Sequence, residues 1–115
     1  MPRKLSVFGN LLTLGNKMDK EYLYKIQAVR LGMLTDQPTE QEQKIVSDHF
    51  LYLQKLKEQG IVKMAGRTLN SDERIFGIVI FNAESDLHAE QIMNNDPAIQ
   101  LNVMSGELYP FRTAL

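Results

Sequence analysis

The stretch FGIVIFNAESDLHAEQIMNNDP, residues 76–97, decides the fold of this chain. Phe76–Ala83 is apolar on both of its faces, which predicts a strand at the centre of a sheet or between two layers. Ser85 is a favourable N-cap for a helix over Asp86–Asn94, and Asp96-Pro97 then begins a loop. The stretch therefore predicts a buried strand followed directly by a short helix. The apolar side of this helix is formed by Leu87, Ala89, Ile92 and Met93.

A strand and a capped helix precede this stretch. Tyr22–Leu34 is rich in Tyr, Leu, Ile and Val and predicts a first strand, which Asp36-Gln37-Pro38 ends. Residues 39–42, Thr-Glu-Gln-Glu, have the pattern of a capping box, in which the threonine accepts from the last amide and the last glutamate reaches back. This pattern predicts a helix that runs to about Gln59, where Gly60 supplies a left-handed stop.

Two further strands complete the predicted sheet. Ile61–Leu69 predicts the second strand, in which Ala65-Gly66 offers room for close approach of a backbone, and a hairpin turn at residues 70–72 follows. Leu101–Phe111 predicts the last strand. The order β-α-β-β-α-β is that of a ferredoxin-like α+β fold. Because helices cover only one face of such a sheet, the apolar residues on the other face predict a homodimer through it.

The composition is that of an ordinary globular domain. The 115 residues are 43% hydrophobic and 23% charged, which suits one domain with a real core. A net charge of −1 without a basic run argues against nucleic-acid binding. No stretch reaches the roughly 18 apolar residues of a membrane span, and the absence of cysteine excludes disulfides and thiolate chemistry. We therefore expect a cytoplasmic protein that binds neither nucleic acid nor membranes.

The chain divides into an N-terminal extension, residues 1–20, and a domain over residues 21–115. The extension contains turn-prone pairs but also several large apolar side chains, which a free tail would leave in water. We therefore expect it to pack against the domain or against a partner subunit. These side chains are Leu5, Val7, Phe8, Leu11, Leu12 and Leu14.

His49 is the candidate catalytic residue. It lies on the apolar stripe of the first predicted helix, because Ile45, His49, Leu53 and Leu56 are spaced by four, four and three residues. A buried imidazole needs a hydrogen-bond partner, and the candidate is Asp96. A histidine paired with a carboxylate is a plausible acid–base site. The alternative is a structural histidine, with Asp96 serving only to cap a turn.

Several of these features together resemble the YciI-like (YCII-related) proteins of the dimeric α+β barrel superfamily. The resemblance covers roughly Tyr22 to Phe111 and rests on the order and spacing of its elements. They are His49, Leu53, Leu56, Gly60, Ala65-Gly66, Phe76-Gly77, Ala89, Asp96-Pro97 and Tyr109-Pro110-Phe111. The resemblance implies a His49–Asp96 pair in a pocket that takes small cyclic or aromatic compounds. One activity in the family is dehydrochlorination of a chlorinated hydroquinone.

The chain departs from the family pattern at three positions. Arg67 stands where many members have proline, Asn102 where a glycine is usual, and Val46 where an arginine is frequent. Arg67 is either an anion clamp at the mouth of the pocket or an ion-pair partner of Asp72 or Glu73 across the hairpin. We take Arg67, Tyr24 and Asn102 as candidate substrate-binding residues.

No metal or cofactor is expected. His88 falls among polar residues on the solvated side of the second helix, and with His49 it forms no ligand-spacing signature for zinc. The residues then permit two functions. The first is a lyase or isomerase in which His49 transfers a proton and Asp96 orients it, acting on a compact cyclic molecule. The second is a non-catalytic dimeric module that binds a small metabolite in the same pocket.

Overall fold

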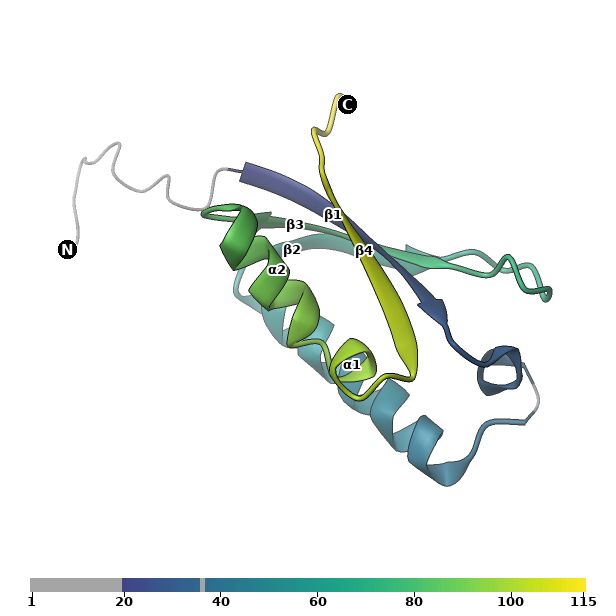
Figure 1. Cartoon of the computed structure of the whole chain (residues 1–115). Coiled ribbons are helices and arrows are strands. Elements are labelled where there is room, and N and C mark those ends of the chain that lie inside the picture. The colour runs from purple at the N-terminus through teal and green to yellow at the C-terminus, as the bar shows by residue number, and fades with distance from the viewer. Residues whose placement is uncertain (1–19, 36) are drawn as a thin grey trace, which may run out of the picture.

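The computed structural model describes residues 20–35 and 37–115. The predicted packing of the N-terminal extension therefore lies outside the described residues, apart from Lys20. Figure 1 shows a single sheet with the main helices gathered beneath it, and the hairpin between β2 and β3 extends beyond them. Among the described residues, no helix is both long enough and apolar enough to cross a membrane.

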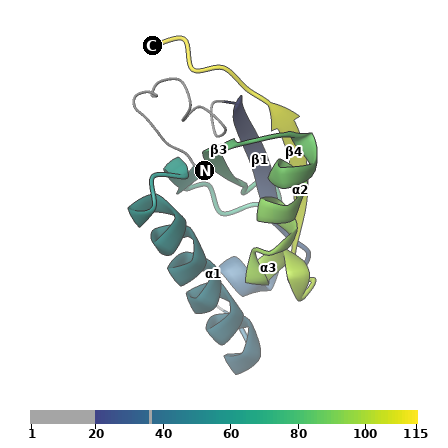
Figure 2. The same cartoon turned by 90° about the vertical axis from the view of Figure 1, so that its left-hand side faces the viewer.

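Four strands form one antiparallel sheet in the order β2-β3-β1-β4. They are β1, Lys20–Ala28; β2, Val62–Arg67; β3, Gly77–Ala83; and β4, Met104–Pro110. The helices lie on the same side of this sheet, as the rotated view in Figure 2 shows. The predicted ferredoxin-like α+β fold is confirmed, with the Phe76–Ala83 segment supplying the predicted central strand.

Both main helices begin at the predicted caps. In α1, Glu40–Glu58, the Thr39 hydroxyl accepts from the Glu42 amide at 3.0 Å, and the Thr39 amide donates to the Glu42 carboxylate at 2.9 Å. Gly60 follows with a φ of 78°, the left-handed stop. In α2, Asp86–Asn94, the Ser85 hydroxyl accepts from the His88 amide at 3.1 Å. The local signals of the sequence therefore define these two helices.

The first predicted strand is too long. β1 ends at Ala28, and Leu31–Leu34 forms a short 3-10 helix, η2, instead of continuing the strand. The strand stops there because its neighbours stop: β3 begins opposite Ile26 and β4 begins opposite Ala28. Without a partner strand, the backbone groups beyond Ala28 must find hydrogen bonds locally.

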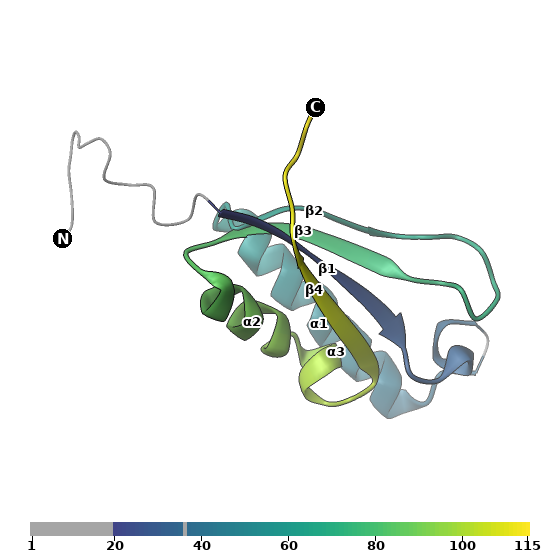
Figure 3. The ribbon, with the colours of Figure 1, turned by 45° about the horizontal axis from the view of Figure 1, so that its top comes forward.

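The predicted loop after Asp96 contains a further helix, α3, Pro97–Gln100. Asp96 is its N-cap and Pro97 occupies its first turn, where proline is well suited. The last strand consequently starts at Met104 and not at Leu101. Figure 3 shows α3 between the end of α2 and the start of β4. This extra turn of helix positions the carboxylate of Asp96 beneath the sheet.

The core lies between the helices and one face of the sheet. Tyr22, Tyr24 and Ile26 alternate along β1 toward α1 and α2 and pack with Val79 and Phe81 of β3. The opposite face, which no described helix covers, carries five sizeable apolar side chains. The register places Leu23, Met64, Ile78, Ile80 and Tyr109 there.

Close backbone approach occurs at a different glycine from the predicted one. A Cβ atom on Gly66 would meet nothing within 4 Å, so that position is open among the described residues. A Cβ atom on Gly77 would instead lie 3.1 Å from the carbonyl oxygen of Gly66 and 3.0 Å from Ile26 Cγ2. The tight contact therefore belongs to Gly77, on the strand paired with Ala65-Gly66. Leu87 also departs from prediction, since it is exposed and not on the packed side of α2.

Candidate active site

Asp96 is a fully buried carboxylate at the centre of the candidate site. Its Oδ2 accepts from the hydroxyl of Tyr24 at 2.7 Å, and its Oδ1 accepts from the backbone N–H of Ala98 at 3.0 Å. Both oxygens therefore already act as acceptors. A buried carboxylate needs such donors, because an unpaired charge away from water is costly.

His49 lies against this carboxylate. Its Nδ1 is 2.8 Å from both Oδ1 and Oδ2 of Asp96, so the predicted contact between the two side chains is present. Since Tyr24 and Ala98 use the carboxylate as an acceptor, the imidazole meets it with an Nδ1–H donor. In a neutral ring this arrangement leaves Nε2 without a proton, and no described residue hydrogen-bonds to that nitrogen. The neutral ring thus presents a base on its far side from Asp96.

A pocket of about 540 Å³ opens beside His49. It lies between α1, η2 and the adjoining ends of β1, β2 and β3. Most of its wall is apolar, as at Met33, Val46, Leu53 and Val79. Its size and apolar wall suit a compact organic molecule, with His49 as one of a few polar groups that fix orientation.

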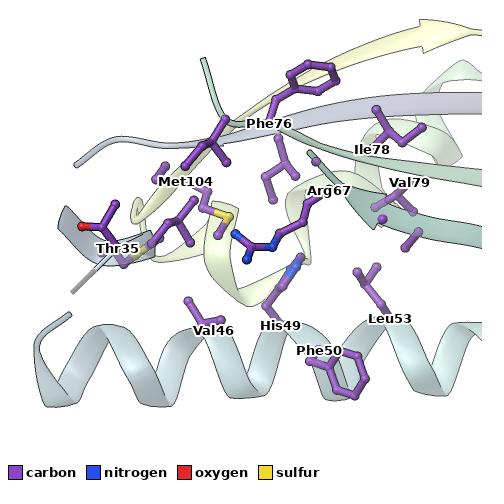
Figure 4. A pocket seen from close by; sticks show the side chains of 18 residues that line it. Thr35, Val46, His49, Phe50, Leu53, Arg67, Phe76, Ile78, Val79 and Met104 are labelled. Atoms are coloured by element: carbon purple, nitrogen blue, oxygen red, sulfur yellow. The ribbon is translucent and has the colours of Figure 1, made fainter. Parts of the chain in front are cut away.

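Arg67 enters this pocket from β2. In Figure 4 its guanidinium extends from the sheet toward His49, which rises from α1 on the opposite wall. The alternative role, an ion pair across the hairpin, is not seen: Asp72 accepts from Arg74 at 2.7 Å, and neither Asp72 nor Glu73 contacts Arg67. Within the described residues Arg67 forms no hydrogen bond or ion pair.

Tyr24 and Asn102 lie elsewhere. Tyr24 is fully buried on the far side of Asp96, where burial and the nearby carboxylate raise the pKa of its hydroxyl well above the ordinary value. Asn102 lies in the turn that follows α3 and has a φ of 62°. Neither is among the residues that line the pocket. The structure therefore places Tyr24 as a support for Asp96 and Asn102 as a turn residue.

The η2 end of the pocket is held by an ion pair that the sequence did not reveal. Arg30, just before η2, donates from Nε to Glu42 at 3.0 Å and forms a second, shorter bond from its terminal nitrogen. The hydrogen bonds from Arg30 lower the pKa of Glu42 to about 2. Because Glu42 also caps α1, this contact fixes η2 against the start of that helix.

The second histidine is not part of the site. His88 Nδ1 accepts from the backbone N–H of Glu84 at 3.0 Å, a contact local to the start of α2. Within residues 20–35 and 37–115, no three His, Asp or Glu side chains are grouped to hold a metal ion. His49 and Arg67 both line the described pocket, and Asp96 lies behind His49.

An antiparallel sheet in the order β2-β3-β1-β4, with its helices on one side, defines this molecule as a ferredoxin-like α+β domain. The family model of the YCII-related domain matches residues 22–112, so the chain belongs to that family. No curated protein sequence matches it.

Two solved structures show the same fold at low sequence identity. One is 5-chloro-2-hydroxyhydroquinone dehydrochlorinase from Burkholderia phenoliruptrix AC1100, in complex with 2,5-dihydroxybenzoquinone: 17% identity, TM-score 0.58, covering 81% of this chain and 95% of that one. The other is muconolactone isomerase: 14% identity, TM-score 0.61, covering 82% of this chain and 91% of that one. This chain thus spans nearly the whole length of both.

Proposed function

We propose that this protein is a cofactor-independent lyase or isomerase that uses His49 and Asp96 as an acid–base pair on a compact cyclic substrate. The observation that carries the proposal is the contact of Nδ1 with both oxygens of Asp96, which leaves Nε2 as the free base of a pocket-lining imidazole. The names of the two structural relatives, a dehydrochlorinase and an isomerase of small ring compounds, agree with this class of reaction.

In the proposed reaction, Nε2 of His49 removes a proton from a carbon of the bound ring. The resulting imidazolium is stabilised by Asp96, which keeps the ring orientation and does not take the proton itself. An isomerase would return that proton to a different atom of the same molecule. A lyase would let the electron pair of the broken C–H bond expel a leaving group. Both outcomes need only this pair and a substrate held at the right distance.

Replacing His49 by Gln tests the proposal. Turnover of muconolactone and of 5-chloro-2-hydroxyhydroquinone is measured for the wild type and the variant, with His88→Gln as the control outside the pocket. Loss of the base is expected to lower turnover by about 10²–10⁴-fold while the protein stays folded. Equal turnover by H49Q and wild type would refute the role of His49. Binding of these compounds by the wild type without turnover would instead favour a metabolite-binding module.

We also propose that two copies associate through the open face of the sheet. Leu23, Ile80 and Tyr109 lie side by side there in adjacent strands, and no described helix covers them. Leu23→Asp is expected to produce a monomer by light scattering, because it places a charge in the proposed contact. Leu87→Asp is the matched control, since Leu87 is exposed on α2, away from this face. A wild-type protein that is monomeric at micromolar concentration would contradict the proposal.

A further inference from the structure

The direction of Arg67 is set by an irregularity at the start of β2. The pairing of β2 with β3 shifts between Val62 and Met64: Val62 lies opposite Phe81, whereas Met64 lies opposite Ile80. In a regular strand Val62, Met64 and residue 66 would share one face, and Arg67 would point to the other. The shift reverses this alternation beyond Val62. Such bulges commonly re-aim a side chain next to an active site.

The resulting register places Arg67 on the helix-facing side of the sheet. It pairs with Gly77, which itself lies opposite Ile26, a residue of the core. Gly77 has no side chain to fill the space beside Arg67, and a Cβ atom there would come within 3.8 Å of the Arg67 Cβ. The guanidinium therefore reaches along the pocket toward His49, as Figure 4 shows.

The electrostatics of the pocket are correspondingly simple. Among the described residues that line it, Arg67 alone carries a permanent charge. No described carboxylate neutralises it, because Asp72 pairs with Arg74 and the buried Asp96 contacts His49 and Tyr24. A guanidinium presents donors in a fixed fork that matches a carboxylate bidentately.

We propose that the natural ligand is a compact, largely apolar ring that carries one carboxylate, bound by Arg67 with its reactive carbon facing His49. This inference rests on the proposed function for the role of Nε2, whereas the charge preference of Arg67 rests on the pocket alone. Arg67 holds the anionic group, the apolar wall holds the ring, and Nε2 faces the carbon from which a proton is removed. The distance between the Arg67 guanidinium and Nε2 of His49 determines how far the carboxylate of the ligand must lie from its reacting carbon.

Matched pairs of small probes test the charge preference. Benzoate and benzamide, and 2,5-dihydroxybenzoate and its amide, differ in charge but hardly in shape. Binding is followed by NMR titration, with the backbone amides of Gly66 and Gly77 as reporters inside the pocket. Each carboxylate is expected to bind about tenfold more tightly than its amide. Added salt should weaken the carboxylates more than the amides, because it screens the charge.

Two variants assign the preference to Arg67. Arg67→Gln should bring each carboxylate to the affinity of its amide and leave the amide unchanged, whereas Arg67→Lys should keep part of the preference. Arg74→Gln is the control: it removes the same charge from the same hairpin, but its guanidinium is bound to Asp72 and lies outside the pocket. It should leave all affinities unchanged.

Equal affinities for acid and amide in the wild type would overturn the inference. So would a carboxylate preference that survives Arg67→Gln, or the absence of binding by every carboxylate at about 10 mM, where even weak specific ligands occupy a site. His49→Gln separates this inference from the proposed function. It should lower turnover by about 10²–10⁴-fold but keep the carboxylate preference, so either claim can fail while the other stands.

Discussion

The hydroxyl of Tyr24 donates to Oδ2 of Asp96 across 2.7 Å, and both residues are fully buried. The two lie 72 positions apart in the chain, on β1 and at the start of α3. This bond joins the central sheet to the carboxylate that faces His49. Three donors, from Tyr24, His49 and Ala98, therefore surround one side chain.

Tyr24→Phe should destabilise the protein by about 1–3 kcal/mol, because it removes a donor from a buried carboxylate without filling the gap. Urea unfolding followed by circular dichroism measures the change. Tyr22→Phe is the control, since its hydroxyl donates to the exposed carboxylate of Asp86 and its loss should change the free energy of unfolding by less than about 1 kcal/mol. Equal effects of the two substitutions would contradict the supporting role of Tyr24.

The same tyrosine predicts a loss of stability at high pH. Burial raises the pKa of Tyr24 far above the ordinary value of 10.0 and that of Tyr52 to about 12. A raised pKa favours the protonated phenol of the folded state, so this stability is complete below about pH 10 and decreases as the unfolded chain ionises. Each group should contribute a slope of about 1.4 kcal/mol per pH unit above that point. For Tyr52 the loss should end near pH 12.

Urea unfolding between about pH 9 and 12 measures these slopes. Tyr24→Phe and Tyr52→Phe should each reduce the slope of the free energy of unfolding against pH by the contribution of one tyrosine. This holds whatever the effect of the substitution at neutral pH. A wild-type free energy of unfolding that is constant across this range would show that folding does not raise the pKa of either tyrosine.

Asp96→Asn should remove activity by changing the tautomer of His49. The new amide donates to Nδ1, which places the remaining proton of the neutral ring on Nε2 and leaves no base in the pocket. Turnover should decrease by at least about 10²-fold. Nitrogen-15 NMR of the imidazole reports which nitrogen carries the proton. A variant that keeps the proton on Nδ1 would contradict this account of the pair.

Gly77→Ala should destabilise the protein by about 1 kcal/mol, because its methyl group would be pressed against the backbone oxygen of Gly66. Gly66→Ala, in the paired strand, is the matched control. Nothing lies within 4 Å of its added Cβ, so this substitution should be neutral or stabilise by up to about 0.5 kcal/mol. Thermal unfolding of the two variants side by side measures the difference.

Local signals of the sequence are sufficient for α1 and α2, since Thr39, Glu42 and Ser85 cap them through neighbours in the chain. The end of β1 could not be read in this way, because it depends on where β3 and β4 stop. The helix α3 did leave a signal, an aspartate followed by proline at the first helical position. Four residues are too few for a periodic pattern, so the sequence predicts a loop there.

The site was predictable to a similar extent. The helical spacing around His49 placed the imidazole on the packed face of α1, and its contact with Asp96 followed from the search for a partner. The role of Tyr24 did not, because its hydroxyl reaches Asp96 only through the packing of α3 under β1. The inward direction of Arg67 depends on the register shift after Val62, which the sequence of β2 does not reveal.

Asp96 both caps α3 and contacts Nδ1 of His49. Its replacement would therefore disturb more of the structure than replacement of His49. Replacing His49 would remove one of the three donors to Asp96 and leave those from Tyr24 and Ala98. Replacing Asp96 would also remove the cap of α3 and the partner of Tyr24. Relatives that lack the proposed acid–base activity should therefore keep this aspartate more often than the histidine.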